Sequence, residues 1–286
     1  MTDAPAAVVV NYNAGSHLVA CIRSLRAEGV ERIVVVDNAS SDGSVEAAAA
    51  ADGEIEVVQT GSNLGFGSAA NRGADRVAGD VLVMNPDTLM EPGSVKAMAA
   101  VLEHDVEVGI VGPRIENPDG SLYPSPRTFP AMGDALGHAF VGLVAPRNRF
   151  TRRYRMLDWD HTVVARAQWV SGACMLVRRS CFDALSGFDQ RYFMYVEDVD
   201  LCWRAHRAGW AVAYEPAARV VHLQGVSSDL VPYRMIAAHH RSLFQFWWKT
   251  TSGPGRLALT PLVAGGLALR TVLASLQRLL ESVWHR

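Results

Sequence analysis

The chain has 286 residues, of which 49% are hydrophobic and 20% charged, and its formal net charge is -2. This length and composition are those of a globular protein with a sizeable core, and they exclude long-range disorder, a collagen-like repeat and a disulfide-dense scaffold. The 4 cysteines form no C-x-x-C pair, so we expect packing residues in a reducing compartment instead of a structural zinc site. The near-neutral total also argues against a nucleic-acid partner.

The neutral total conceals two oppositely charged parts. Residues 1–120 contain 7 Lys+Arg and 18 Asp+Glu, a net charge of -11, whereas residues 121–286 contain 20 and 11, a net charge of +9. Of the 27 basic residues, only Lys96 and Lys249 are lysines. Arginine binds phosphate through a planar fork, which fits an anionic partner, but this usage also follows from genomic base composition. Both explanations stay open.

Short apolar runs alternate with helical patterns through the first third of the chain. The runs at 7–11, 33–37, 55–59 and 81–85 predict strands, and helices are expected between them, beginning near Ser16, Ser41 and Ser68. This alternation predicts an α/β fold with a mainly parallel sheet, right-handed connections and ligands at the carboxyl ends of the strands.

The remainder of the chain is less regular. A fifth strand is predicted at 108–112, and the Pro-, Gly- and Arg-rich stretch at 113–159 predicts loops and short elements. Ordered structure is expected again at 169–178, as a helix at about 198–208 and as strands at 211–214 and 219–222. We expect one domain over residues 1–232, in two halves that meet at 112–113, followed by a helical tail over residues 233–286.

The tail is basic, apolar and aromatic. Residues 233–286 contain 7 Lys+Arg and 1 Glu, a net charge of +6. The longest uncharged apolar stretch, 257–269, contains Pro261 and two glycines and is shorter than the ~18 residues that a membrane-spanning helix needs. Leucines then recur at helical spacing, which predicts an interfacial helix lying on a bilayer; packing on its own domain or on a second subunit is the alternative. No secretory signal is expected, because the N-terminus has no basic region.

Polar residues follow the early predicted strands. Asn11, Asp37, Asn85 and Asp87 would line one rim of the sheet, where a nucleotide lies across the switch point. Asp42, at a helix start, has a simpler explanation as a cap. The segment 63–71, NLGFGSAAN, is a Gly-rich turn into a helix, which lets the backbone approach a ligand. It follows the third strand instead of the first, which counts against NAD.

Several motifs in a fixed order carry a resemblance. VVVNYN (8–13), VDNASSDGS (36–44), NLGFGSAANRG (63–73) and MNPD (84–87) resemble the donor half of inverting family 2 glycosyltransferases of the GT-A fold. WVSGACMLVRR (169–179) and YFMYVEDVDL (192–201) resemble the acceptor half. More narrowly, YPSPR (123–127), APRNRFTRRYR (145–155) and AAHHRS (237–242) are similar to actinobacterial rhamnosyltransferases that act on N-acetylglucosaminyl-diphospho-decaprenol. The resemblance then covers nearly the whole chain.

The resemblance implies a Rossmann-like fold that binds a nucleotide-sugar. It implies that Asp37 hydrogen-bonds the pyrimidine base and that Asp87 holds Mg²⁺ or Mn²⁺ against the donor diphosphate. The family's D-x-D motif falls on 85–87, where Asn85 departs from the two-aspartate form, so His222 is expected as a second ligand, with a structural role at a strand end as the alternative. The implied nucleotide contacts are Asn11, Asn13, Asp37, Asn38, Asn63, Gly65, Gly67, Asn71 and Asn85.

Transfer with inversion needs a carboxylate that takes the proton of the attacking hydroxyl. The resemblance implies Asp198 as this base, with Glu197 orienting the acceptor or partner arginines, and a metal as Lewis acid on the leaving group. Trp169 is expected to stack on the acceptor sugar or, equally, to be a core residue. The implied acceptor contacts are Arg127, Trp169, Ser171, Gly172 and Asp200, although cap geometry is the competing explanation for Asp200.

The resemblance implies transfer of L-rhamnose from dTDP-β-L-rhamnose to the GlcNAc of a polyprenyl diphosphate, at the cytoplasmic face of the cell membrane. The product belongs to the linker between arabinogalactan and peptidoglycan. The alternatives are a family 2 enzyme with a UDP- or GDP-sugar donor, a nucleotidyltransferase and a non-catalytic membrane scaffold. A nucleotidyltransferase would need a basic Gly-rich loop after the first strand, and residues 11–15 contain no Lys or Arg. A homodimer is left open.

Overall fold

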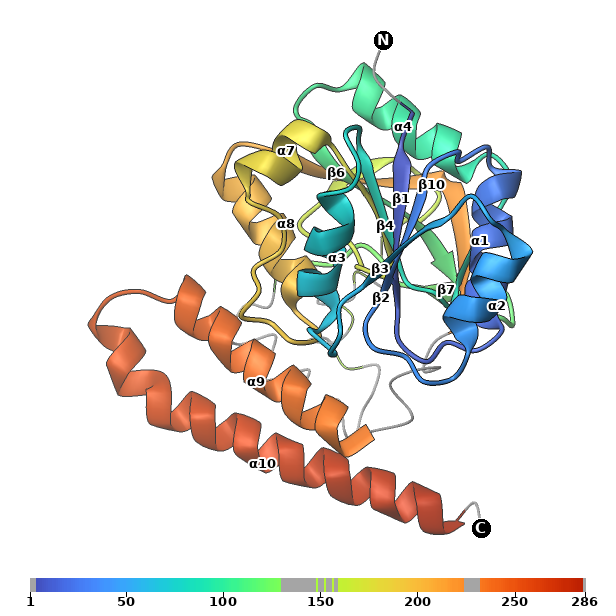
Figure 1. Cartoon of the computed structure of the whole chain (residues 1–286). Helices are drawn as coiled ribbons and strands as arrows, with labels where there is room; N and C mark the ends of the chain where they lie inside the picture. The colour runs from blue at the N-terminus through green and yellow to red at the C-terminus, as the bar shows by residue number, and fades with distance from the viewer. Residues whose placement is uncertain are drawn as a thin grey trace.

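The computed structural model describes residues 4–129, 148, 152, 156, 159–223 and 232–284, with side chains to residue 280. Most of the motif at 145–155 and part of the expected loop region at 113–159 lie outside the described residues. Within them, a sheet with the strand order β3-β2-β1-β4-β9-β6-β10-β5 forms the centre of the molecule, and β7 and β8 add to β6 and β10. Helices cover both of its faces (Figure 1).

The first four strands of the sheet order are parallel to one another. They are β1 (Ala6–Asn11), β2 (Ile33–Asp37), β3 (Glu56–Gln59) and β4 (Val81–Met84). β1, β2 and β4 are buried along their whole length, which explains their near-continuous valine runs, because helices exclude water from both faces. These strands agree with the predicted runs to within one or two residues.

The other half of the sheet is mixed. β9 (Cys174–Val177) is antiparallel to β4 and to β6 (Val108–Glu116), and β10 (Ala211–His222) is parallel to β6. β5 (Thr88–Met90) and β8 (Ala165–Ala167) are antiparallel to β10, and β7 (Leu122–Tyr123) is antiparallel to β6. The two strands expected at 211–214 and 219–222 are therefore one strand, whose register shifts between Glu215 and Arg219. β6 also runs through the expected boundary at 112–113.

Two hydrophobic cores lie on opposite faces of the sheet. Alternate residues of β1 and β2 face α1 (His17–Ala27), α2 (Ser44–Ala51) and α4 (Ser94–His104) on one side. On the other side they face α3 (Phe66–Ala74), α7 (Arg179–Ala184) and α8 (Glu197–Arg207). All four cysteines are buried and free, as expected for packing residues; burial raises the pKa of Cys181 to about 12.

Two long helices follow the sheet domain. α9 (Pro232–Thr250) packs on the domain, where Ser242 and Phe246 are buried, and α10 (Pro254–Trp284) packs on the outer side of α9 (Figure 1). α10 continues through Pro261 and is 31 residues long, so the helix is longer than the uncharged stretch at 257–269. Its stretch Pro254–Leu280 is long and apolar enough to cross a membrane, by length and composition only.

Candidate active site

Asn11 and Asp37 end neighbouring parallel strands and are paired in register. Both are almost fully buried, and Asn11 Nδ2 donates to Asp37 Oδ1 at 3.2 Å. The backbone amide of Ser40 also donates to the Asp37 carboxylate. Asn11 Oδ1 is buried and has no hydrogen-bond partner among the described residues, so it can accept a hydrogen bond from a ligand. The ends of these two strands thus form a polar site, which contains the Asp37 carboxylate implied to bind the pyrimidine base.

Asn13 and Asp42 shape the loops above this rim. Asn13 is left-handed, with φ of 48°, and its Oδ1 accepts the backbone amide of Ser41 at 2.8 Å. Asp42 accepts the backbone amides of Gly15 at 2.7 Å and Ser44 at 3.1 Å, at the start of α2. These bonds favour the capping alternative for Asp42.

The Gly-rich turn is held against the acceptor half. Gly65 has φ of 83°, and a Cβ on it would lie 2.0 Å from the carbonyl oxygen of Phe193, so only glycine fits there. Asn38 and Asn63 secure the turn, because Asn38 Oδ1 accepts the amide of Leu64 at 2.8 Å and Asn63 Oδ1 accepts that of Gly65 at 3.0 Å. Gly65 therefore allows the backbone of Phe193 to approach closely, whereas the sequence predicted the close approach of a ligand at this turn.

Asn71 and Gly67 join α3 to the loop before residue 190. The side chain of Asn71 makes two hydrogen bonds to the backbone of Phe188. Its Nδ2 donates to the carbonyl oxygen at 2.8 Å, and its Oδ1 accepts the backbone amide at 2.8 Å. A Cβ on Gly67 would lie 2.8 Å from Phe188 Cβ. Both residues have structural partners, and a direct contact with the donor nucleotide stays a prediction for them.

Asp87 and His222 meet because β10 is antiparallel to β5, with His222 opposite Thr88. His222 Nε2 lies 3.2 Å from Asp87 Oδ1 and 3.3 Å from Asn85 Nδ2. Apart from the imidazole, Asp87 Oδ1 has no partner among the described residues although it is buried. A carboxylate and an imidazole suit Mn²⁺ or Mg²⁺ as a ligand pair, so these side chains fit a divalent ion. No third His, Cys, Asp or Glu completes a cluster with them in the described part of the chain.

Glu197 and Asp198 begin α8 directly after an unusual turn. Tyr195 and Val196 have φ of 64° and 70°, a left-handed conformation that a β-branched residue such as valine rarely adopts. Backbone strain of this kind concentrates at functional sites, where the surrounding structure maintains it. The turn places both carboxylates in the first turn of a helix, where the helix dipole favours negative charge.

Asp198 faces the turn at Ser171 and Gly172. Its Oδ2 accepts the amide of Gly172 at 2.9 Å, and its Oδ1 accepts the amide of Val199 at 2.8 Å. A Cβ on Gly172 would lie 3.1 Å from Asp198 Cβ, so the glycine permits this close approach. Ser171 is buried and its Oγ accepts the amide of Ala173 at 3.3 Å.

Burial affects both carboxyl groups at the start of α8. Burial raises the pKa of Glu197 well above its usual range, and the charge of Asp198 raises it further. Burial also raises the pKa of Asp198, against the amides of Gly172 and Val199 and the charge of Arg127, which lower it. Glu197 is buried and its Oε2 has no partner among the described residues, whereas Asp198 is partly exposed, so Asp198 is the more accessible of the two carboxylates.

Arg127 and Trp169 form one wall near Asp198. Their backbones are bridged in both directions, and the Arg127 guanidinium carbon lies 5.0 Å from the centre of the Trp169 ring. Trp169 is 5% exposed and its indole nitrogen donates to the carbonyl of Thr128 at 2.9 Å. This burial favours the core alternative for Trp169, with Arg127 as the side chain that it supports.

Asp200 lies in the interior of the domain. The expected acceptor contact is at odds with its place in the interior, where it is 0% exposed. It accepts from Lys249 Nζ at 2.6 Å, Arg204 Nε at 2.7 Å and the hydroxyl of Tyr192 at 3.3 Å. Sequence reasoning missed this ion pair with α9, although Lys249 is one of only two lysines in the chain.

The family model "Glycosyltransferase like family 2" matches residues 4–237. The chain belongs to this family. It is a glycosyltransferase, with the GT-A-type mixed sheet that the sequence resemblance predicts.

This glycosyltransferase has relatives over nearly its whole length. It is 39% identical over 297 aligned residues to an N-acetylglucosaminyl-diphospho-decaprenol L-rhamnosyltransferase of Mycobacterium tuberculosis, covering 97% of this chain and 96% of the relative. Two solved structures share its fold. GalNAc-T7 with UDP, GalNAc and Mn²⁺ has a TM-score of 0.57 at 14% identity, covering 77% of this chain and 43% of that one. Staphylococcus aureus TarS with UDP has a TM-score of 0.55 at 15% identity, covering 84% and 65%.

Proposed function

We propose that this glycosyltransferase moves L-rhamnose from dTDP-β-L-rhamnose to the GlcNAc of a polyprenyl diphosphate with inversion, in the synthesis of a cell-wall linker. The observation that carries the proposal is the 39% identity to an enzyme of that name over 97% of the chain. The site geometry is consistent with it, because a polar nucleotide rim and a reachable carboxylate belong to the same sheet domain. UDP- and GDP-sugars are the competing donors.

Asp198 is the general base in this proposal. Its carboxylate takes the proton of the acceptor hydroxyl while that oxygen attacks the anomeric carbon, and the bond from this carbon to the nucleoside diphosphate breaks on the opposite face. The amides of Gly172 and Val199 hold the carboxylate in one orientation. Glu197 precedes Asp198 on α8 and is buried, and burial raises its pKa well above its usual range.

Asp87 and His222, with Asn85 beside them, would hold a divalent ion at the donor diphosphate. Such an ion, when bound, acts as a Lewis acid that neutralises charge on the leaving group. The support from this chain is the buried Asp87 oxygen and the imidazole that faces it at 3.2 Å. Asn11 and Asp37 would meanwhile orient the nucleotide through its base.

The first test is Asp198→Asn with a dTDP-rhamnose donor and a GlcNAc-diphospho-lipid acceptor. We expect kcat to fall ~10²-fold or more while dTDP binding is unchanged, because an amide cannot accept the proton. Asp183→Asn, an exposed carboxylate on α7, is the matched control and should retain full activity. A near-normal kcat in Asp198→Asn would contradict the assignment of the base. Faster turnover of the wild-type protein with a UDP- or GDP-sugar would show that dTDP-rhamnose is not the preferred donor.

The second test addresses the divalent ion by direct binding. Mn²⁺ binding in the presence of dTDP, followed by electron paramagnetic resonance, should weaken at least tenfold in Asp87→Asn and in His222→Gln, since each removes a ligand of the pair. EDTA should abolish turnover in the wild-type protein, and Mn²⁺ should restore it. Unchanged Mn²⁺ affinity in both variants would place the ion elsewhere.

We further propose that α10 lies on the cytoplasmic face of the membrane. Its outward side is apolar, and Leu262, Leu269 and Leu276 are 66%, 52% and 50% exposed at seven-residue spacing. The charge of Arg270 is directed toward α9, where it adds to burial in lowering the pKa of His240. A helix with its apolar side outward and its charges inward is unsuited to water and suited to the acyl boundary of a bilayer.

A further inference from the structure

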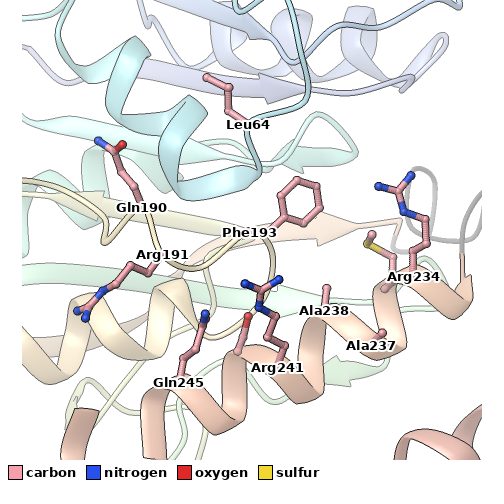
Figure 2. A pocket seen from close by; sticks show the side chains of 11 residues that line it. Leu64, Gln190, Arg191, Phe193, Arg234, Ala237, Ala238, Arg241 and Gln245 are labelled. Carbon is pink, nitrogen blue, oxygen red and sulfur yellow. The ribbon is translucent and has the colours of Figure 1, made fainter. Parts of the chain in front are cut away.

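A cavity of about 450 Å³ lies between the sheet domain and α9, apart from the nucleotide rim. Leu64 of the Gly-rich turn and Phe193 line it from the domain, and Arg234, Met235 and Arg241 line it from α9 (Figure 2). Both polar and apolar groups therefore surround one space, as a ligand with an anionic and an apolar part requires.

The two arginines of α9 are available to a ligand. Arg234 and Arg241 are seven residues apart, on one face of the helix, and both are exposed. No ion pair is found for either in the described part of the chain. Arg191, which also lines the cavity, differs because its guanidinium binds Asp189, and Figure 2 shows it turned away from Phe193, toward which Arg241 extends.

The cavity adjoins the turn that positions the base. Phe193 is 36% exposed and precedes the strained residues Tyr195 and Val196. α9 is fastened to this turn, because Ser242 Oγ donates to the carbonyl of Met194 at 3.0 Å and the Tyr195 ring packs on His239 at 5.2 Å. A group bound between Arg241 and Phe193 is thus held near the start of α8.

We propose that this cavity binds the diphosphate of an isoprenoid-linked acceptor, with Arg234 and Arg241 as its phosphate ligands. Phe193, Met235 and Leu64 then contact the first isoprene units. This inference rests on the proposed function for the identity of the acceptor. A guanidinium group can donate two parallel hydrogen bonds to the oxygens of one phosphate. α9 lies between the sheet domain and the apolar α10 (Figure 1), which places the cavity on the side of the domain that α10 covers.

The test measures binding of farnesyl diphosphate, which carries no sugar, to the full chain in detergent. Arg234→Gln and Arg241→Gln should each raise its Kd about tenfold or more, because each removes a charge-assisted bond to phosphate. Arg76→Gln, an exposed arginine beyond α3, is the single-charge control and should bind as the wild type does. Farnesol, without phosphate, should bind weakly to all four proteins.

Steady-state kinetics then distinguish an effect on acceptor binding from an effect on donor binding. The two variants should raise KM for a GlcNAc-diphospho-lipid and leave KM for the nucleotide-sugar unchanged. A rise in donor KM instead, or an unchanged Kd for farnesyl diphosphate in both variants, overturns the inference. Arginine-dependent farnesyl diphosphate binding without rhamnosyl transfer to any lipid acceptor would refute the proposed function alone.

Discussion

At the scale of single residues, the charge state of Asp198 is set by opposing effects. Burial raises its pKa, and the amides of Gly172 and Val199 and the charge of Arg127 lower it. A general base needs a pKa high enough to attract a proton but low enough to be ionised at the working pH. Arg127, stacked on Trp169, is the charged contribution that a substitution can remove.

Arg127→Gln tests this balance through the pH dependence of kcat/KM. Loss of the positive charge raises the pKa of Asp198 further, and only the ionised form is active, so the acidic limb of the profile should move to higher pH. Arg166→Gln, an exposed arginine on β8, is the control and should leave the limb in place. A limb that stays fixed in Arg127→Gln, or moves to lower pH, would exclude the proposed interaction.

At the scale of secondary-structure elements, an interior ion pair joins α9 to α8, the helix that carries Asp198. Lys249 Nζ lies 2.6 Å from an oxygen of the fully buried Asp200 and 2.8 Å from Asp189. Asp200 is two residues beyond Asp198 on α8, so α9 is fastened to the helix that carries Asp198. Removing one partner of a buried pair leaves an uncompensated charge.

Lys249→Met should therefore lower the free energy of unfolding by about 1–3 kcal/mol, with Arg204 still pairing Asp200. Lys96→Met, at the other lysine of the chain, replaces an exposed side chain on α4 and should change stability little. Urea denaturation of both variants measures the difference. Equal stability of the two would mean that the Lys249 pair contributes nothing to the fold.

The outward side of α10 is the second feature at this scale. Leu269→Glu places a charge in the middle of its apolar side, so retention on anionic vesicles should fall severalfold, because burying a carboxylate in the acyl boundary is unfavourable. Val106→Glu is the matched control, since Val106 is 76% exposed and lies before β6, away from α10. Sedimentation with vesicles provides the measurement, and equal retention of both variants would refute bilayer contact through this side.

At the scale of the whole molecule, the unequal charge of the two parts of the chain corresponds to two kinds of partner. The first 120 residues have a net charge of -11 and contain Asp37 and Asp87, for which donor binding is proposed. The remaining residues have a net charge of +9, and α9 and α10 carry Arg234, Arg241 and Arg270 within them. Separation of charge in this way suits a transferase that combines carboxylate chemistry with an anionic lipid acceptor.

The sequence by itself determined the parallel half of the sheet, the family and the strand-end residues. Valine-rich runs flanked by helical periodicity encode β1, β2 and β4 locally, since each run needs burial on both faces. The motif around Asp198 is likewise contiguous in sequence, so its position at the start of α8 was accessible without coordinates.

Only the tertiary structure decided which of the singled-out residues are buried and which are accessible. Asp200 and Trp169 have the residue types of a binding site, but packing places them in the interior, against Lys249 and Arg127. The pairing of Asp87 with His222, far apart in sequence, depends on the antiparallel register of β5 and β10. The cavity lined by Phe193 and α9 exists only because α9 packs against the sheet domain. Such contacts are set by long-range packing, which local periodicity does not encode.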